Sequence, residues 1–86
     1  MTDKPALPPL PTLEPGLYRH YRGLHYEVIG VVRHSETREA MVLYRPLYGE
    51  GAMWVRPFEM FLETVEHEGQ SIPRFSRFQP PPEVSA

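Results

Sequence analysis

The chain has 86 residues, a formal net charge of −2 and no cysteine. This length allows one small domain with a modest core, and the lack of cysteine excludes a disulfide framework, a thiolate zinc site and a cysteine nucleophile. No apolar run approaches the roughly 20 residues that a membrane helix needs, and the N-terminus lacks a basic-then-apolar signal pattern. We therefore expect no membrane segment and a cytoplasmic location.

The charges are unevenly distributed along the sequence. All basic residues but one are arginines, which favours planar contacts and stacking over diffuse attraction, whereas every charge from Glu59 to Glu68 is acidic. A negative net charge does not suggest a nucleic-acid binder, so any such role has to be local.

Both ends of the chain are rich in proline. We expect residues 1–15 to form a disordered leader and residues 79–86 a disordered tail, because proline lacks a backbone donor and holds the chain near polyproline II. One folded domain is predicted between them, over residues 16–78.

The residues between these ends predict short strands and one helical turn. Alternating and β-branched residues separated by Gly-containing or polar turns favour strands, and the spacing of Phe58, Phe61 and Leu62 favours a helical turn after Pro57. In chain order, the predicted strands are 17–22, 24–34, 40–48, 52–56 and 62–67, followed by a loosely apolar arm over 72–78. We interpret this as a mostly β fold, a small SH3-like antiparallel barrel of four to five strands.

Gly30 interrupts the longest predicted strand. Val28 and Val31 cannot both point inward in a regular strand, because successive residues alternate faces. We therefore expect a bulge or kink at Gly30, with unusual backbone angles or no room for a side chain, so that Gly30→Val would destabilise the domain by at least about 1–3 kcal/mol.

The next hairpin sets the faces of its two strands. If it closes symmetrically about Gly49 and Glu50, Tyr44 pairs with Val55 and Arg45 pairs with Trp54. Tyr44, Met53 and Val55 then share one face, and the other carries Arg45, Trp54 and Arg56.

Several blocks of the sequence resemble the bacterial family called domain of unknown function 1653. These blocks are GLYRHYRG with YEVIG (residues 16–30), RHSET (33–37), LYGE (47–50) and WVRP with EMF (54–61). The resemblance covers roughly Gly16 to Phe75 and implies a short bacterial protein, for which the family offers no established activity.

The leading functional hypothesis is a non-enzymatic binding module. Aromatic rings beside guanidinium groups suit an extended peptide or single-stranded nucleic acid. The predicted binding residues are Trp54, Arg56, Arg45, Arg33, Tyr18 and Tyr21.

The alternative hypothesis is a small hydrolase or metal-binding enzyme that uses His34, Glu36 and His20. A histidine next to a carboxylate and hydroxyls can act as a general base. However, neighbouring residues in a turn diverge, and the sequence has no H-x-H or H-E-x-x-H pattern. We predict no cofactor and no metal site, and the sequence leaves the partner and a homo-oligomeric state open.

Overall fold

The computed structural model describes residues 8–78, in which strands dominate. Every strand pair is antiparallel, and no helix of this region has the length and apolarity to cross a membrane. The elements in chain order are β1 (Gly16–His20), β2 (His25–Arg33), β3 (Ala40–Pro46), β4 (Trp54–Pro57), α1 (Phe58–Phe61), β5 (Thr64–His67), β6 (Gln70–Pro73) and β7 (Phe75–Arg77).

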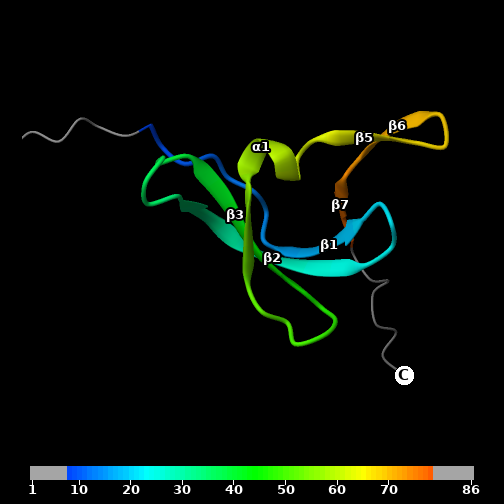
Figure 1. Cartoon of the computed structure of the whole chain (residues 1–86), viewed down its shortest axis with the longest axis horizontal. Helices are drawn as coiled ribbons and strands as arrows, with labels where there is room; N and C mark the ends of the chain where they lie inside the picture. The colour runs from blue at the N-terminus through cyan, green and yellow to red at the C-terminus, as the bar shows by residue number, and fades with distance from the viewer. Residues whose placement is uncertain (1–7, 79–86) are drawn as a thin grey trace, which may run out of the picture.

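Five strands form one sheet in the order β4-β3-β2-β1-β7, and β5 and β6 form a separate hairpin. Figure 1 shows this hairpin standing away from the sheet, on the far side of α1 from β3. Strands β4 and β7 are the two edges and do not pair with each other, so the sheet is open and not closed into a barrel. The mostly β prediction is confirmed, whereas the SH3-like barrel is not formed. Four-residue β4 ends at Pro57, which has no N–H with which to extend a ladder.

The predicted irregularity near Gly30 is present as a shift in the register of β2 against β3. Val28 pairs with Tyr44 and Gly30 pairs with Leu43, so Ile29 is the extra residue. This shift puts Val28 and Val31 on the same face, as the pattern of valines required. The steric part of the prediction is wrong: Gly30 has no left-handed φ, and, chain neighbours aside, no heavy atom of residues 8–78 lies within 4 Å of where its Cβ would sit.

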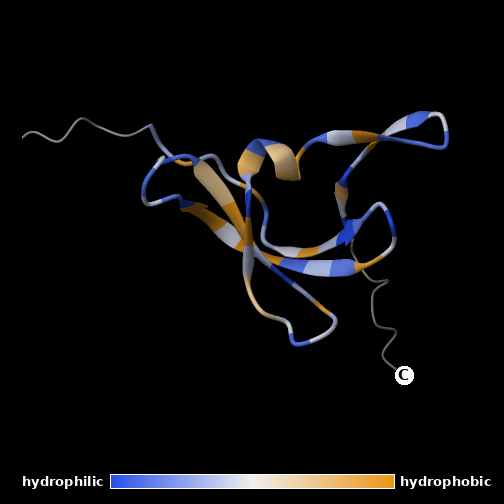
Figure 2. Cartoon of the chain, in the orientation of Figure 1, coloured by the Kyte–Doolittle hydropathy of each residue, from blue (hydrophilic) through white to orange (hydrophobic). Residues whose placement is uncertain are grey.

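The hydrophobic core is built mainly from aromatic rings on one face of the sheet, which we call the inner face. The core cluster consists of Tyr18, Tyr26, Val28, Val42, Tyr44, Phe61 and Phe75. Phe61 of α1 is fully buried and stacks on Phe75 of β7, with ring centroids 4.0 Å apart and planes 2° apart. The helical turn thus covers the inner face, and apolar residues gather along β2, β3 and α1 (Figure 2).

The β3–β4 hairpin has a register one residue away from the predicted one. Tyr44 pairs with Trp54, and Leu43 pairs with Val55. The connection is a wide loop with left-handed glycines, Gly49 at φ 64° and Gly51 at φ 69°, rather than a turn symmetric about residues 49 and 50. Because a slip of one residue exchanges the faces of a strand, the side chains of β4 are reversed relative to the prediction.

The segment from Pro8 to Pro15 contacts the domain, although we expected a disordered leader there. Leu13 packs against the core cluster, and the Tyr18 hydroxyl donates a hydrogen bond to the Glu14 carbonyl at 2.8 Å. Arg33 Nη2 donates to the Pro8 carbonyl at 2.8 Å. Residues 1–7, and the tail predicted over residues 79–86, lie outside the described residues.

Candidate functional site

The structure separates the arginines that the sequence placed on one face with Trp54. Trp54 and Arg56 lie on the inner face, because their partners on β3 are Tyr44 and Val42. Arg45 lies on the opposite face, where its Nη2 is 2.6 Å from Glu27 Oε1 in a partly exposed ion pair. Arg56 is half-buried, donates from Nε to the Tyr44 hydroxyl at 3.2 Å and lies over the Phe75 ring. The predicted surface of Arg45, Trp54 and Arg56 is therefore not formed.

The other predicted binding residues are also dispersed. Tyr18 is a core residue with 4% of its surface exposed, so its ring cannot stack on a ligand. Tyr21 is half-buried in the turn between β1 and β2, where its hydroxyl accepts a hydrogen bond from Arg22 Nε at 3.2 Å. Arg33 is at the other end of β2 and holds the leader.

An accessible aromatic pair is nevertheless present at the β3–β4 loop. Trp54 is 45% exposed and Tyr48 is 41% exposed, and both border a hollow of about 280 Å³. We call this hollow the Tyr–Trp slot; it is lined by Pro46, Tyr48, Gly49, Glu50, Gly51, Ala52 and Trp54. Its lining combines two flat rings, a pyrrolidine ring and one carboxylate. A slot of this kind accepts a small, flat, apolar group.

The two rings of the slot are supported from below by core tyrosines. The Trp54 ring meets the Tyr44 ring edge to face, with centroids 6.0 Å apart, and the Tyr48 ring meets the Tyr26 ring in the same way at 5.7 Å. The Tyr26 and Tyr48 hydroxyls are also 2.9 Å apart in a hydrogen bond. Burial, together with this hydrogen bond, raises the pKa of Tyr26 to about 12. The Tyr26 phenol therefore stays protonated at neutral pH, and its hydrogen bond and ring contact fix the position of Tyr48.

A cationic region surrounds His20 at the β1–β2 turn. Burial first, and then the guanidinium groups of Arg74, Arg56 and Arg22, lower the pKa of His20. His20 Nδ1 accepts the backbone N–H of Arg22 at 3.2 Å, so the neutral ring carries its proton on Nε2. Arg74 is paired with Glu63 at 2.8 Å, which reduces the positive field there.

The residues of the alternative enzymatic hypothesis do not come together. His20 ends β1 and His34 follows the far end of β2, a strand of nine residues, so they are separated by roughly 30 Å. Figure 1 shows the two turns concerned on opposite sides of the molecule. His34 Nδ1 accepts the backbone N–H groups of Glu36 and Thr37, both at 3.1 Å, so this nitrogen stabilises the turn. No group of three potential metal ligands lies together within residues 8–78.

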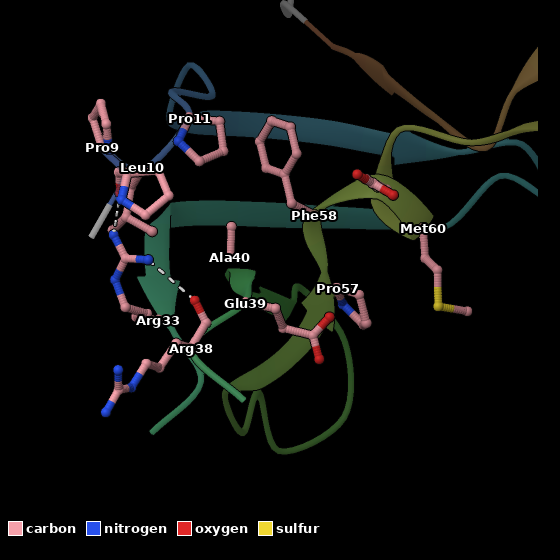
Figure 3. Close-up of a pocket in the computed structure, with 12 residues that line it drawn as sticks. Pro9, Leu10, Pro11, Arg33, Arg38, Glu39, Ala40, Pro57, Phe58 and Met60 are labelled. Carbon is pink, nitrogen blue, oxygen red and sulfur yellow. Dashed lines mark hydrogen bonds between the residues drawn. The ribbon is translucent and has the colours of Figure 1, made fainter. Parts of the chain in front are cut away.

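A larger groove lies between the leader and α1, on the side of the molecule away from the slot. It encloses about 560 Å³, and Figure 3 shows Pro9, Leu10 and Pro11 on one wall and Phe58 opposite, with Ala40 between them. Arg33 bridges the leader and the β2–β3 turn, because its Nη1 also donates to the Arg38 carbonyl at 3.1 Å. Two of its donors thus hold the groove wall in place.

Sequence reasoning missed Pro46, Tyr48 and Glu50 as site residues. The sequence signal for Tyr48 and Glu50 was the LYGE block, residues 47–50, which carried part of the family resemblance. The block was assigned to a strand end and a turn, and no feature of a single sequence reveals that this loop is wide enough to turn Tyr48 towards Trp54.

The comparisons with known proteins agree on one family. The family model described as protein of unknown function (DUF1653) matches residues 16–77. The crystal structure of a protein belonging to this family from Bordetella bronchiseptica is similar, with 38% sequence identity and a TM-score of 0.72, covering 83% of this chain and 95% of that chain. A comparison with curated proteins gives no significant match. The chain therefore belongs to the DUF1653 family of proteins of unknown function.

Proposed function

We propose that this domain is a non-enzymatic binding module that holds extended, proline-containing peptides in the Tyr–Trp slot. The observation that carries the proposal is the pair of exposed rings, Tyr48 and Trp54, facing one hollow with Pro46 at its edge. Aromatic-lined grooves recognise proline because its compact apolar ring packs against aromatic rings and its backbone is already ordered as polyproline II.

Charge favours a peptide over a polyanion. The chain has a net charge of −2 and a pI of about 6.0, whereas nucleic-acid-binding domains usually have a basic face and a high pI. The charged residue of the slot is Glu50, a carboxylate that attracts a basic side chain next to the prolines of a peptide.

The test is a titration of the full chain with a fluorescein-labelled dodecapeptide that contains prolines and one arginine. We expect Trp54→Ala and Tyr48→Ala to weaken binding about 30-fold each, which is the effect of losing a hot-spot contact of about 2 kcal/mol. Val55→Ala is the matched control, because Val55 is the next residue, is 52% exposed and lies on the opposite face. Equal affinities for the Trp54→Ala and Val55→Ala proteins would rule the slot out as the binding site.

Single-stranded nucleic acid is the second candidate ligand, and the convergence of Arg22, Arg56 and Arg74 on His20 favours it. Bases would stack on Tyr21 and Trp54 while the guanidinium groups neutralise phosphates. Titration with a labelled oligonucleotide of mixed sequence, at low and at high salt, tests this candidate. A phosphate-driven complex weakens steeply as salt rises, and no detectable binding at low salt would contradict it.

A further inference from the structure

Arg56 is a half-buried arginine that has no carboxylate partner within residues 8–78. The other half-buried arginines of this region are satisfied, because Arg45 and Arg74 each pair with a glutamate and Arg33 donates to two backbone carbonyls. Taking a charge partly out of water costs free energy unless an opposite charge or hydrogen bonds replace the water. Arg56 can therefore accept an anion that the described part of the chain does not supply.

The Arg56 guanidinium is held at one end and free at the other. Its Nε donates to the Tyr44 hydroxyl at 3.2 Å, and its Cζ lies 5.7 Å from the centroid of the Phe75 ring. Neither Nη1 nor Nη2 has a hydrogen-bond partner among residues 8–78, and both atoms are open to solvent. Two N–H groups in this fork match the two oxygens of a carboxylate. The arginine is thus positioned before an anion binds, which lowers the entropy cost of binding.

His20 provides a second donor close to Arg56. Its ring packs on the same Phe75 ring, with centroids 5.0 Å apart. Since His20 Nδ1 accepts the Arg22 N–H, the neutral ring has its proton on Nε2, which is open to solvent and has no partner within residues 8–78. Burial and then the guanidinium groups of Arg74, Arg56 and Arg22 lower the pKa of His20, as expected for a place with an excess of positive charge.

These donors adjoin the Tyr–Trp slot on the inner face. Trp54 and Arg56 are two residues apart on β4, so their Cα atoms are about 7 Å apart and their side chains share a face. Tyr44 contacts both, because its ring meets that of Trp54 at 6.0 Å and its hydroxyl accepts from Arg56. Beyond Arg56 the inner face is covered by α1, whose Phe61 is fully buried. An extended ligand that leaves the slot along β4 therefore reaches Arg56 after about two residues and ends there.

We infer that Arg56 and His20 bind the C-terminal carboxylate of a peptide whose proline occupies the Tyr–Trp slot. This inference rests on the peptide-binding function proposed above and adds the direction in which the peptide lies. The charges on the two sides of Trp54 agree with it, because Glu50 in the preceding loop attracts a basic side chain and Arg56 attracts the terminal carboxylate. The slot thus recognises the end of a chain rather than an internal segment.

The experiment uses the arginine-containing dodecapeptide in two forms, with a proline two residues before its end and fluorescein at its N-terminus. One form has a free C-terminal carboxylate and the other a C-terminal amide. We expect the full-length wild type to bind the acid form about tenfold more tightly, because only this form offers a charged partner to Arg56. Arg56→Gln should abolish the preference. The control, Arg45→Gln, should keep it, because Arg45 lies on the opposite face.

The ring resonances of His20 provide the second measurement, assigned with a His20→Gln variant. We expect the pKa of His20 to be higher in the acid complex than in the amide complex, because a nearby carboxylate favours the imidazolium form. Equal wild-type affinities for the two forms, or equal His20 pKa values in the two complexes, would overturn the inference.

The same titrations separate this inference from the function on which it rests. Equal affinities that still depend on Trp54 would remove the carboxylate site and leave the peptide-binding function standing. Failure of both peptide forms to bind would remove both. Equal affinities together with oligonucleotide binding that Arg56→Gln abolishes would assign these cations to phosphate and overturn the inference.

Discussion

The Tyr26 phenol is the residue in which packing and protonation are most closely linked. Its folded pKa of about 12 is raised above the ordinary value of 10.0, chiefly by burial and then by the hydrogen bond with Tyr48. A neutral phenol is therefore favoured in the folded state. The contribution of the neutral Tyr26 phenol to the free energy of unfolding is fully present below pH 10 and is lost as the pH rises through 12.

A difference titration tests this pKa. We expect the phenolate absorbance of the wild type minus that of Tyr26→Phe to give a midpoint near 12. Tyr48→Phe should lower the midpoint because it removes the hydrogen bond, yet leave it above 10 because burial is the larger cause. A Tyr26 midpoint at 10 in the wild type would show that the ring is open to water.

Gly30 and Gly49 form a matched pair for testing backbone strain. Both have open space where a Cβ would sit among residues 8–78, but only Gly49 has a left-handed φ, of +64°. We expect Gly30→Ala to leave the free energy of unfolding unchanged or to raise it by about 0.4–1 kcal/mol, because alanine restricts the unfolded chain. Gly49→Ala should lower it by about 1–2 kcal/mol, because alanine is strained in that conformation. Urea unfolding measures both, and a large loss in Gly30→Ala would contradict the regular backbone at this position.

At the scale of elements, the leader is the segment whose contribution is easiest to measure. Leu13 packs against the core cluster, while Thr12 beside it is exposed. We expect Leu13→Ala to cost about 1 kcal/mol, less than for a fully buried leucine, and hence to lower Tm by about 4–8 °C in a domain of this size. Thr12→Ala is the control and should leave Tm within about a degree. Equal melting temperatures for the two variants would mean that the leader does not stabilise the domain.

The element that sequence reasoning placed best is the bulged strand β2, and the one it placed worst is β4. For β2, valines on both sides of Gly30 that belong to one face required an extra residue, and such an alternation of residues along one strand is present in the sequence. For β4, the face depends on how the chain crosses residues 47–53, and that path is set by two left-handed glycines and by contacts of Tyr48 with a distant strand. A single loop residue more or less exchanges the two faces, so a local pattern could not assign Trp54 to the inner face.

At the scale of the whole molecule, family and strand content could be predicted, whereas closure of the sheet could not. Closure would require β4 to pair with β7, and both are short edge strands, of four and three residues. Short edge strands offer few backbone groups for further pairing, and Pro57 in β4 has no N–H to donate. Within the arm predicted over residues 72–78, residues 75–77 form β7, because Phe75 has a place in the core beside Phe61.

The predominance of rings in the core has an optical consequence. Five of the seven core residues are aromatic, and their rings meet at fixed angles, such as 61° between Tyr26 and Tyr44 and 68° between Tyr44 and Phe61. Rings held rigidly in an asymmetric arrangement give circular dichroism in the near ultraviolet, and this signal disappears when side-chain packing is lost even if the strands persist. The near-ultraviolet circular dichroism of the unlabelled protein thus reports on its native packing. A collapsed but loosely packed state would be recognised by the loss of this signal.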